Sequence, residues 1–187
     1  KSNKDKYSFD HEIREILPNL FTNYFDEVWD ILGEGLLGDS LTYIKMKFIL
    51  ESKNGNFHEE GGFQYIPEKD YEKIISWCRK HLPKAALRVA YLMPVSDIEN
   101  NKVNWHKFSK RMIDEFGEIE GFLNELSANI GSFGFSGSVI PYYEENLALF
   151  ELLTTHQKIE VRQWAEKMIE QTKKIILREK IDEEDRY

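Results

Sequence analysis

The fold class is decided by the stretch FDEVWDILGEGLL, residues 25–37. Its large apolar residues stand at offsets 0, 3, 4, 7 and 11: Phe25, Val28, Trp29, Leu32 and Leu36. Those offsets form one face of a helix with about 3.6 residues per turn. Related patterns recur at 41–49, 71–82, 86–93, 105–116, 119–130 and 161–176. No strand alternation of comparable length interrupts them, so the sequence predicts an all-α fold of about eight helices.

The helices are spaced like a repeat. The first aromatic residues of alternate helices are separated by 46, 34 and 38 residues: Phe25, Tyr71, Trp105 and Tyr143. Two-helix solenoid units repeat every ~40–47 residues. We therefore expect a single domain, 1–187, built as an irregular HEAT-like α-solenoid of about four helical hairpins. The expected parts are 8–52 (first hairpin with an amino-terminal helix), 53–66 (insertion), 67–94, 105–130, 139–180 and a frayed acidic tail, 181–187.

The composition is that of an ordered protein inside the cell. Of its 187 residues, 41% are hydrophobic and 13% aromatic, enough for a sizeable core. We expect that core to contain Trp29, Ile75, Phe108, Leu126, Phe150 and Trp164. The single cysteine excludes an internal disulfide and a thiolate zinc cluster, and no apolar run is long enough for a membrane span or a signal peptide. We therefore expect a cytoplasmic protein with no membrane partner.

The glycine-rich stretch GSFGFSGSVIPYYEE, residues 131–145, invites comparison with catalytic loops. It has no lysine for a phosphate loop, follows a helix where a dinucleotide turn needs a strand, and lacks the last glycine of G-x-S-x-G. A helix corner accounts for it better. Gly131 then ends one helix with a positive φ, Ser138 caps the next, and Pro141 occupies its first turn.

No residue pattern predicts a metal, a cofactor or a catalytic centre. The five histidines include no pair at the i, i+4 spacing of a helical zinc site: His11, His58, His81, His106 and His156. Cys78 lies on an apolar helix face and is expected to be buried. A small hydrolase with a site near Ser136 or His58 is the least favoured alternative.

Charge is unevenly distributed. The chain carries a net charge of −8, yet residues 79–111 contain eight basic and two acidic residues. The candidate interaction surface consists of seven of these basic residues: Arg79, Lys80, Lys84, Arg88, Lys107, Lys110 and Arg111. It predicts a protein partner or another domain of the same polypeptide. The alternatives are an ordinary solvated surface and a nucleic-acid-binding array, which the net charge does not favour.

The sequence resembles a family of helical repeats. KIEVRQWAEKMI, residues 158–169, resembles the second helix of a HEAT repeat, with Glu160 where an aspartate is usual. The segments 26–39, 105–117 and 126–156 resemble the carboxy-terminal helical region of large bacterial multidomain proteins. Members of that group often carry a nucleotide-hydrolysing module upstream, and some are associated with defence against phage. The resemblance transfers no catalytic residue and implies a non-catalytic interaction or sensor scaffold excised from a longer protein.

Overall fold

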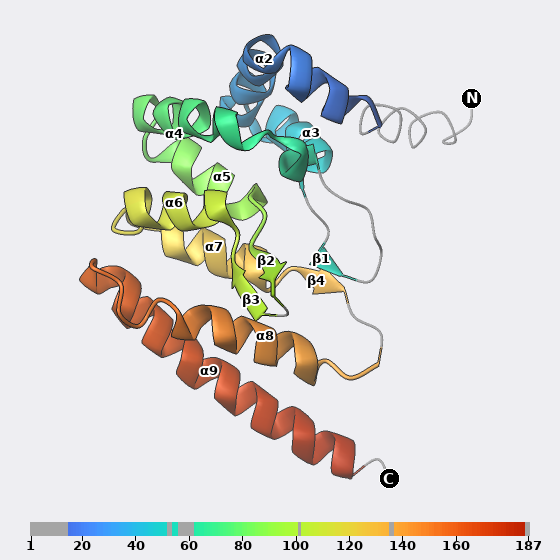
Figure 1. Ribbon diagram of the computed structural model, residues 1–187, viewed down its shortest axis with the longest axis vertical. Helices are drawn as coiled ribbons and strands as arrows, with labels where there is room; N and C mark the ends of the chain where they lie inside the picture. Colours follow the sequence, from blue (N-terminus) through green and yellow to red (C-terminus); the bar gives the residue numbers. More distant parts are fainter. Residues whose placement is uncertain (1–14, 52–53, 56–61, 101, 135–136, 186–187) are drawn as a thin grey trace. The chain divides into compact units, whose positions relative to one another are not determined.

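The computed structural model describes residues 15–51, 54–55, 62–100, 102–134 and 137–185 (Figure 1). Most of the described residues are helical, and they form nine α-helices and two short 3₁₀ helices. The prediction of a largely helical fold is therefore confirmed, although the structure also contains a small β-hairpin that the sequence did not predict. All six residues expected in the core are buried. None of the helices in the described ranges combines the length and the apolar character that a membrane crossing requires.

The chain divides into two compact units. The first consists of Lys1–Lys53 and Phe57–Pro94, and the second of Asn54–Asn56 and Val95–Tyr187. In the first unit residues 15–23 are helical, followed by α2 (Phe25–Leu37), α3 (Ser40–Leu50), η1 (Gly62–Tyr65), η2 (Glu68–Asp70), α4 (Tyr71–Lys80) and α5 (Lys84–Leu92). Within it α2 packs on α3 and α5, and α4 packs on α5.

An aromatic cluster holds the first unit together. Trp29 of α2 stacks on Phe25 at a ring separation of 6.0 Å and meets Trp77 of α4 edge to face at 5.5 Å. Phe63 of η1 also meets Trp29 edge to face, at 6.1 Å, and is 1% exposed. The segment expected as an insertion, 53–66, therefore contributes a core residue, which explains the aromatic side chain at position 63.

The second unit contains the remaining elements. They are β1 (Asn54–Gly55), β2 (Ser96–Glu99), β3 (Lys102–Trp105), α6 (Lys107–Phe116), α7 (Phe122–Ile130), β4 (Phe133–Gly134), α8 (Ile140–Glu151) and α9 (Ile159–Glu184). β2 and β3 pair antiparallel from Ser96 opposite Trp105 to Glu99 opposite Lys102. The helix expected to start at 105 begins instead at Lys107, because Trp105 belongs to β3 and donates its Nε1–H to the Leu149 carbonyl at 2.8 Å.

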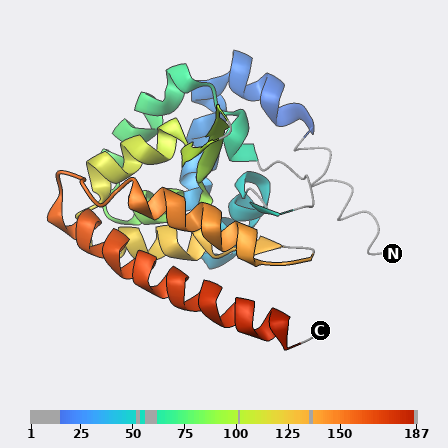
Figure 2. The same ribbon diagram turned by 60° about the horizontal axis from the view of Figure 1, so that its bottom comes forward.

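The carboxy-terminal helices lie side by side along the length of α8 (Figures 1 and 2). Phe150 of α8 meets Trp164 of α9 edge to face at 5.4 Å, and Lys180 pairs with Glu144 at 3.3 Å. Trp164 also donates its Nε1–H to the Ser127 hydroxyl of α7 at 2.9 Å. α9 continues to Glu184, so residues 181–184 of the expected tail are helical.

The glycine-rich stretch divides between a strand and a helix start. Phe133 and Gly134 form β4, which pairs in parallel with β1. Pro141 lies in the first turn of α8, as expected. The N-cap of α8 is Val139 and not the expected Ser138, although the Ser138 hydroxyl accepts a hydrogen bond from the Ile140 amide at 3.2 Å. The prediction for Gly131 is wrong: its φ is −76°. Gly131 keeps a right-handed helical conformation, and its amide continues the helical hydrogen-bond pattern by donating to the Ser127 carbonyl at 3.0 Å. The preceding helix therefore ends without a left-handed residue at this position.

Candidate functional site

The basic residues of the first unit mostly serve the fold. Lys84 and Arg88 of α5 reach the carboxy-terminal end of α2, where Lys84 donates to the Leu37 carbonyl at 2.7 Å and Arg88 to the Leu36 and Gly38 carbonyls. These carbonyls have no partner within the helix, and cations at a helix carboxyl end also interact favourably with its dipole. Two of the seven predicted interaction residues are therefore structural caps.

Two further contacts involve basic side chains near the carboxyl ends of α2 and α4. The Arg88 guanidinium lies over the ring of Tyr43 in α3, at 4.1 Å from its centroid. Arg79, in the last turn of α4, pairs with Glu72 at 2.8 Å, and Lys80 is exposed beside it. Three of the four predicted interaction residues in the first unit thus have partners within the fold: Arg79, Lys84 and Arg88.

The other three residues of the predicted surface lie in the second unit. Lys107, Lys110 and Arg111 are all exposed on α6. Their offsets of 0, 3 and 4 place them on one side of that helix. The opposite side, with Phe108 and Met112, is fully buried. This exposed trio is here called the α6 cationic face.

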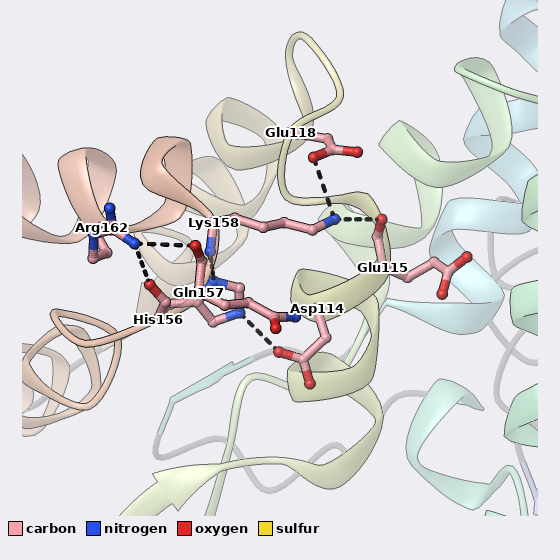
Figure 3. Close-up of polar contacts among 7 residues, drawn as sticks. All are labelled: Asp114, Glu115, Glu118, His156, Gln157, Lys158 and Arg162. Atoms are coloured by element: carbon pink, nitrogen blue, oxygen red, sulfur yellow. Dashed lines mark hydrogen bonds and ion pairs between the residues drawn. The ribbon is translucent and has the colours of Figure 1, made fainter.

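Sequence reasoning missed a cluster of polar contacts around His156, here called the His156 joint, between α6 and the start of α9 (Figure 3). The His156 ring is 8% exposed, and its Nε2 lies 2.8 Å from Oδ1 of Asp114. Its Nδ1 accepts a hydrogen bond from the Lys158 amide at 3.1 Å. The Nδ1 position therefore carries a lone pair and Nε2 carries the proton, which is donated to the carboxylate.

This arrangement differs from a catalytic Asp-His pair. In such a pair one ring nitrogen binds the carboxylate and the other is left to take a proton from the nucleophile. Here the second nitrogen of His156 is occupied by the backbone amide of Lys158. The joint consequently binds the backbone just before α9 and fixes the ring, and its geometry supplies no general base.

Two further side chains complete the joint (Figure 3). The Lys158 ammonium donates to the Glu115 carbonyl at 2.9 Å and lies 3.7 Å from the Glu118 carboxylate. Arg162 donates to the His156 carbonyl at 2.6 Å and the Gln157 carbonyl at 3.1 Å. The arginine of the HEAT-like Val-Arg pair therefore holds the loop that precedes its own helix.

A similar histidine–amide hydrogen bond is found at the start of α6. His106 is the N-cap of α6, and its Nδ1 accepts from the Phe108 amide at 3.2 Å. Its Nε2 lies 3.9 Å from Oδ2 of Asp97 on β2. In both places a histidine accepts a hydrogen bond from the amide two residues later, and an aspartate faces its other nitrogen. A histidine just before a predicted helix is the only sequence signal for this arrangement.

The chemically reactive candidates give no site. Cys78 is fully buried, and this burial raises the pKa of its thiol, which keeps it protonated and unreactive. Within the described ranges, no group of three or more histidine, cysteine, aspartate or glutamate side chains is placed to hold a metal ion. His11, His58 and Ser136 lie outside the described residues.

The chain matches no protein-family model, no curated protein and no solved structure. The HEAT-like resemblance and the multidomain context therefore stay predictions from the sequence.

Proposed function

We propose that this chain is a non-catalytic protein-interaction scaffold of irregular HEAT-like helical hairpins in the cytoplasm, acting within a larger multidomain protein. The pairwise packing of α2 with α3, α4 with α5, and α8 with α9 supports the hairpin organisation. The observation that carries the proposal is an exposed apolar face on α3. Three large side chains form it: Leu41, Ile44 and Phe48, which are 65%, 44% and 53% exposed.

Helix α3 is apolar on two opposite sides. Its inner side consists of Tyr43, Met46 and Leu50, at offsets 0, 3 and 7. Tyr43 lies under Arg88, Met46 fills the space where a Cβ on Gly35 would stand, and Leu50 is fully buried. The packing of α3 in the first unit thus uses the inner side.

The outer side repeats the same offsets with Leu41, Ile44 and Phe48, here called the α3 stripe. A helix with apolar residues on both sides is normally covered on both. Contiguous exposed apolar side chains mark protein interaction sites more often than they stabilise a free domain. The α3 stripe therefore fits the apolar side of a partner helix.

The charge around the stripe indicates the partner's chemistry. Lys45 is exposed on the same side as the stripe, and α3 contains no acidic residue. Lys47, at the edge, donates to the Tyr91 hydroxyl at 3.1 Å and pairs with Glu51 at 3.6 Å. We infer a partner helix with an apolar stripe flanked by acidic side chains, from another protein or another domain of the same polypeptide.

Site-specific photo-cross-linking tests this proposal. A photoreactive amino acid replaces Ile44 in the full-length protein expressed in its native host, and a matched protein carries it at Asn124, which is exposed on α7. The expected result is a discrete protein adduct at position 44 that is absent at position 124. The same adduct pattern at both positions, or no adduct at position 44, would contradict the proposal.

The α6 cationic face favours nucleic-acid binding as a second candidate function. Lys107, Lys110 and Arg111 present three positive charges on one side of a helix. Phosphate contacts make binding fall steeply with salt, with a slope of about −0.9 per contact for duplex DNA. The test titrates duplex DNA and single-stranded RNA at low and high salt with the wild type and a Lys107→Glu/Lys110→Glu/Arg111→Glu variant. Equal binding by both proteins would remove this candidate.

A further inference from the structure

Two helices in different units expose matching patterns of charge and apolar surface. On α2 the pattern is Glu27, Ile31 and Glu34, here called the acidic face. On α9 it is Lys173, Leu177 and Lys180, here called the basic face. In each, a charged residue is followed four residues later by an aliphatic residue and seven residues later by a second charge of the same sign.

The aliphatic centres of both faces are open to solvent. Ile31 is 70% exposed and Leu177 is 62% exposed, and the next residue on the same side of α9, Ile181, is 50% exposed. Each of these side chains therefore leaves half or more of its surface in water. Their burial against each other would be favourable, because it removes apolar surface from water.

The charges beside them are largely uncompensated. Glu27, Glu34 and Lys173 are exposed, and no described residue forms an ion pair with any of them. Among the described residues, Lys180 pairs only with the exposed Glu144, at 3.3 Å. Asp30 adds a further exposed negative charge at the edge of the acidic face. The two faces are therefore complementary in charge as well as in apolar content.

The spacing of the faces matches residue for residue. When α2 and α9 are aligned in parallel, Glu27 falls opposite Lys173, Ile31 opposite Leu177, and Glu34 opposite Lys180. The outer charges of each face are seven residues apart, which is about 10 Å along a helix rising ~1.5 Å per residue. Both ion pairs can therefore form at once without bending either helix.

The same alignment accounts for the acidic end of α9. It places Glu184 opposite Gly38, just beyond the carboxyl end of α2. Lys84 and Arg88 lie at that end, bound to the last carbonyls of α2. In this alignment Glu184 would thus lie near Lys84 and Arg88. An alignment shifted toward the amino-terminal end of α2 would instead bring Glu184 against the acidic face.

We propose that the chain binds a second copy of itself head to tail, with the acidic face of α2 in one copy against the basic face of α9 in the next. This contact uses neither the α3 stripe nor the α6 cationic face, so it stands independently of the proposed function. Each bound pair keeps one acidic and one basic face unoccupied. Association therefore continues beyond the dimer unless the copies close into a ring.

Sedimentation velocity with paired charge reversals tests the contact. Wild-type protein should form dimers and larger species as its concentration rises to about 0.5 mM at low salt, with at least tenfold weaker association in 0.5 M NaCl, where the screening length is only a few ångströms (~4 Å). Glu27→Lys/Glu34→Lys and Lys173→Glu/Lys180→Glu should each be monomeric alone. An equimolar mixture of the two should associate again, because each then offers the face that the other needs.

Matched controls keep the result unambiguous. Lys107→Glu/Lys110→Glu changes the net charge by the same amount as Lys173→Glu/Lys180→Glu and should associate like wild type. Oxidation of a mixture of Ile31→Cys and Leu177→Cys proteins should give a disulfide heterodimer, whereas Ile31→Cys mixed with Asn124→Cys should not. A wild type that stays monomeric at 0.5 mM, a mixture that fails to associate, or a control that loses association would each overturn the proposal.

Discussion

The His156 joint makes a graded prediction for unfolding free energy. Replacement of His156 by alanine removes two hydrogen bonds, one to the Asp114 carboxylate and one from the Lys158 amide. A hydrogen bond to a charged group contributes about 1.5–3 kcal/mol net, and the lower figure applies here because the Asp114 side chain is 44% exposed. The backbone bond adds about 1 kcal/mol. His156→Ala should therefore cost about 2.5 kcal/mol.

Two other replacements separate the bonds. Asp114→Ala removes only the carboxylate contact and should cost about 1.5 kcal/mol. His156→Asn loses the same contact, but its side-chain oxygen can still accept from the Lys158 amide, as asparagine does at helix starts. It should therefore recover about 1 kcal/mol relative to His156→Ala. Once His156 is alanine, a further Asp114→Ala replacement should cost almost nothing, because the two side chains share one interaction.

The assay is urea unfolding followed by far-ultraviolet circular dichroism at pH 7.5. Ring ¹⁵N chemical shifts of His156 provide a second readout, with Nδ1 unprotonated and Nε2 protonated. The reasoning is refuted if His156→Asn is as destabilised as His156→Ala, if Asp114→Ala costs as much as His156→Ala, or if Nδ1 carries the proton.

Three further predictions concern the first unit. Phe63→Ala should cost about 3–5 kcal/mol in urea unfolding, because it empties a buried ring site beside Trp29; a loss below 1 kcal/mol would show that the η1 segment lies outside the core. Burial raises the pKa of the Cys78 thiol above its ordinary 9.0, so the folded state favours the neutral thiol. The stability that this preference contributes is present below pH 9.0 and is lost at higher pH. Iodoacetamide at pH 8 should modify Cys78 only in urea, and rapid labelling of folded protein would contradict its burial. The hydrogen bond from the Thr42 amide lowers the pKa of Asp39 below 3.8. The Asp39 carboxylate therefore stabilises α3 above pH 3.8, and this stabilisation is lost as the pH falls through the pKa of the folded state. An Asp39 pKa at or above 3.8, measured by NMR titration, would disprove the cap.

Helices were predictable because their apolar residues recur at helical spacing over two or more turns. The stripe from Phe25 to Leu36 gave α2, and Trp164 and Phe150 were correctly placed in the core. The β2–β3 hairpin was missed because each strand has four residues and β2 has no buried residue, so the pattern shows no alternation. Asn100, which follows β2 and has a φ of 51°, is a residue type that indicates a turn between the two strands.

Contacts distant in sequence were beyond prediction. Lys84 and Arg88 appeared as part of a basic stretch, and only the packing of α5 on α2 shows that they cap a helix end. The His156 joint depends on Asp114, 42 residues away, and histidine is not among the preferred helix caps. The left-handed glycines, Gly121 and Gly137, were likewise not distinguishable from Gly131 by composition.

The central claim is that the exposed outer side of α3 is available to a partner. Urea unfolding of a Leu41→Ser/Ile44→Ser/Phe48→Ser variant tests this most directly. Exposed substitutions change stability by only about 0.5 kcal/mol each, so the variant should keep the wild-type midpoint to within about 1.5 kcal/mol. A loss of about 4 kcal/mol or more, the size expected for emptying buried sites, would show that the stripe belongs to the core and would contradict the claim.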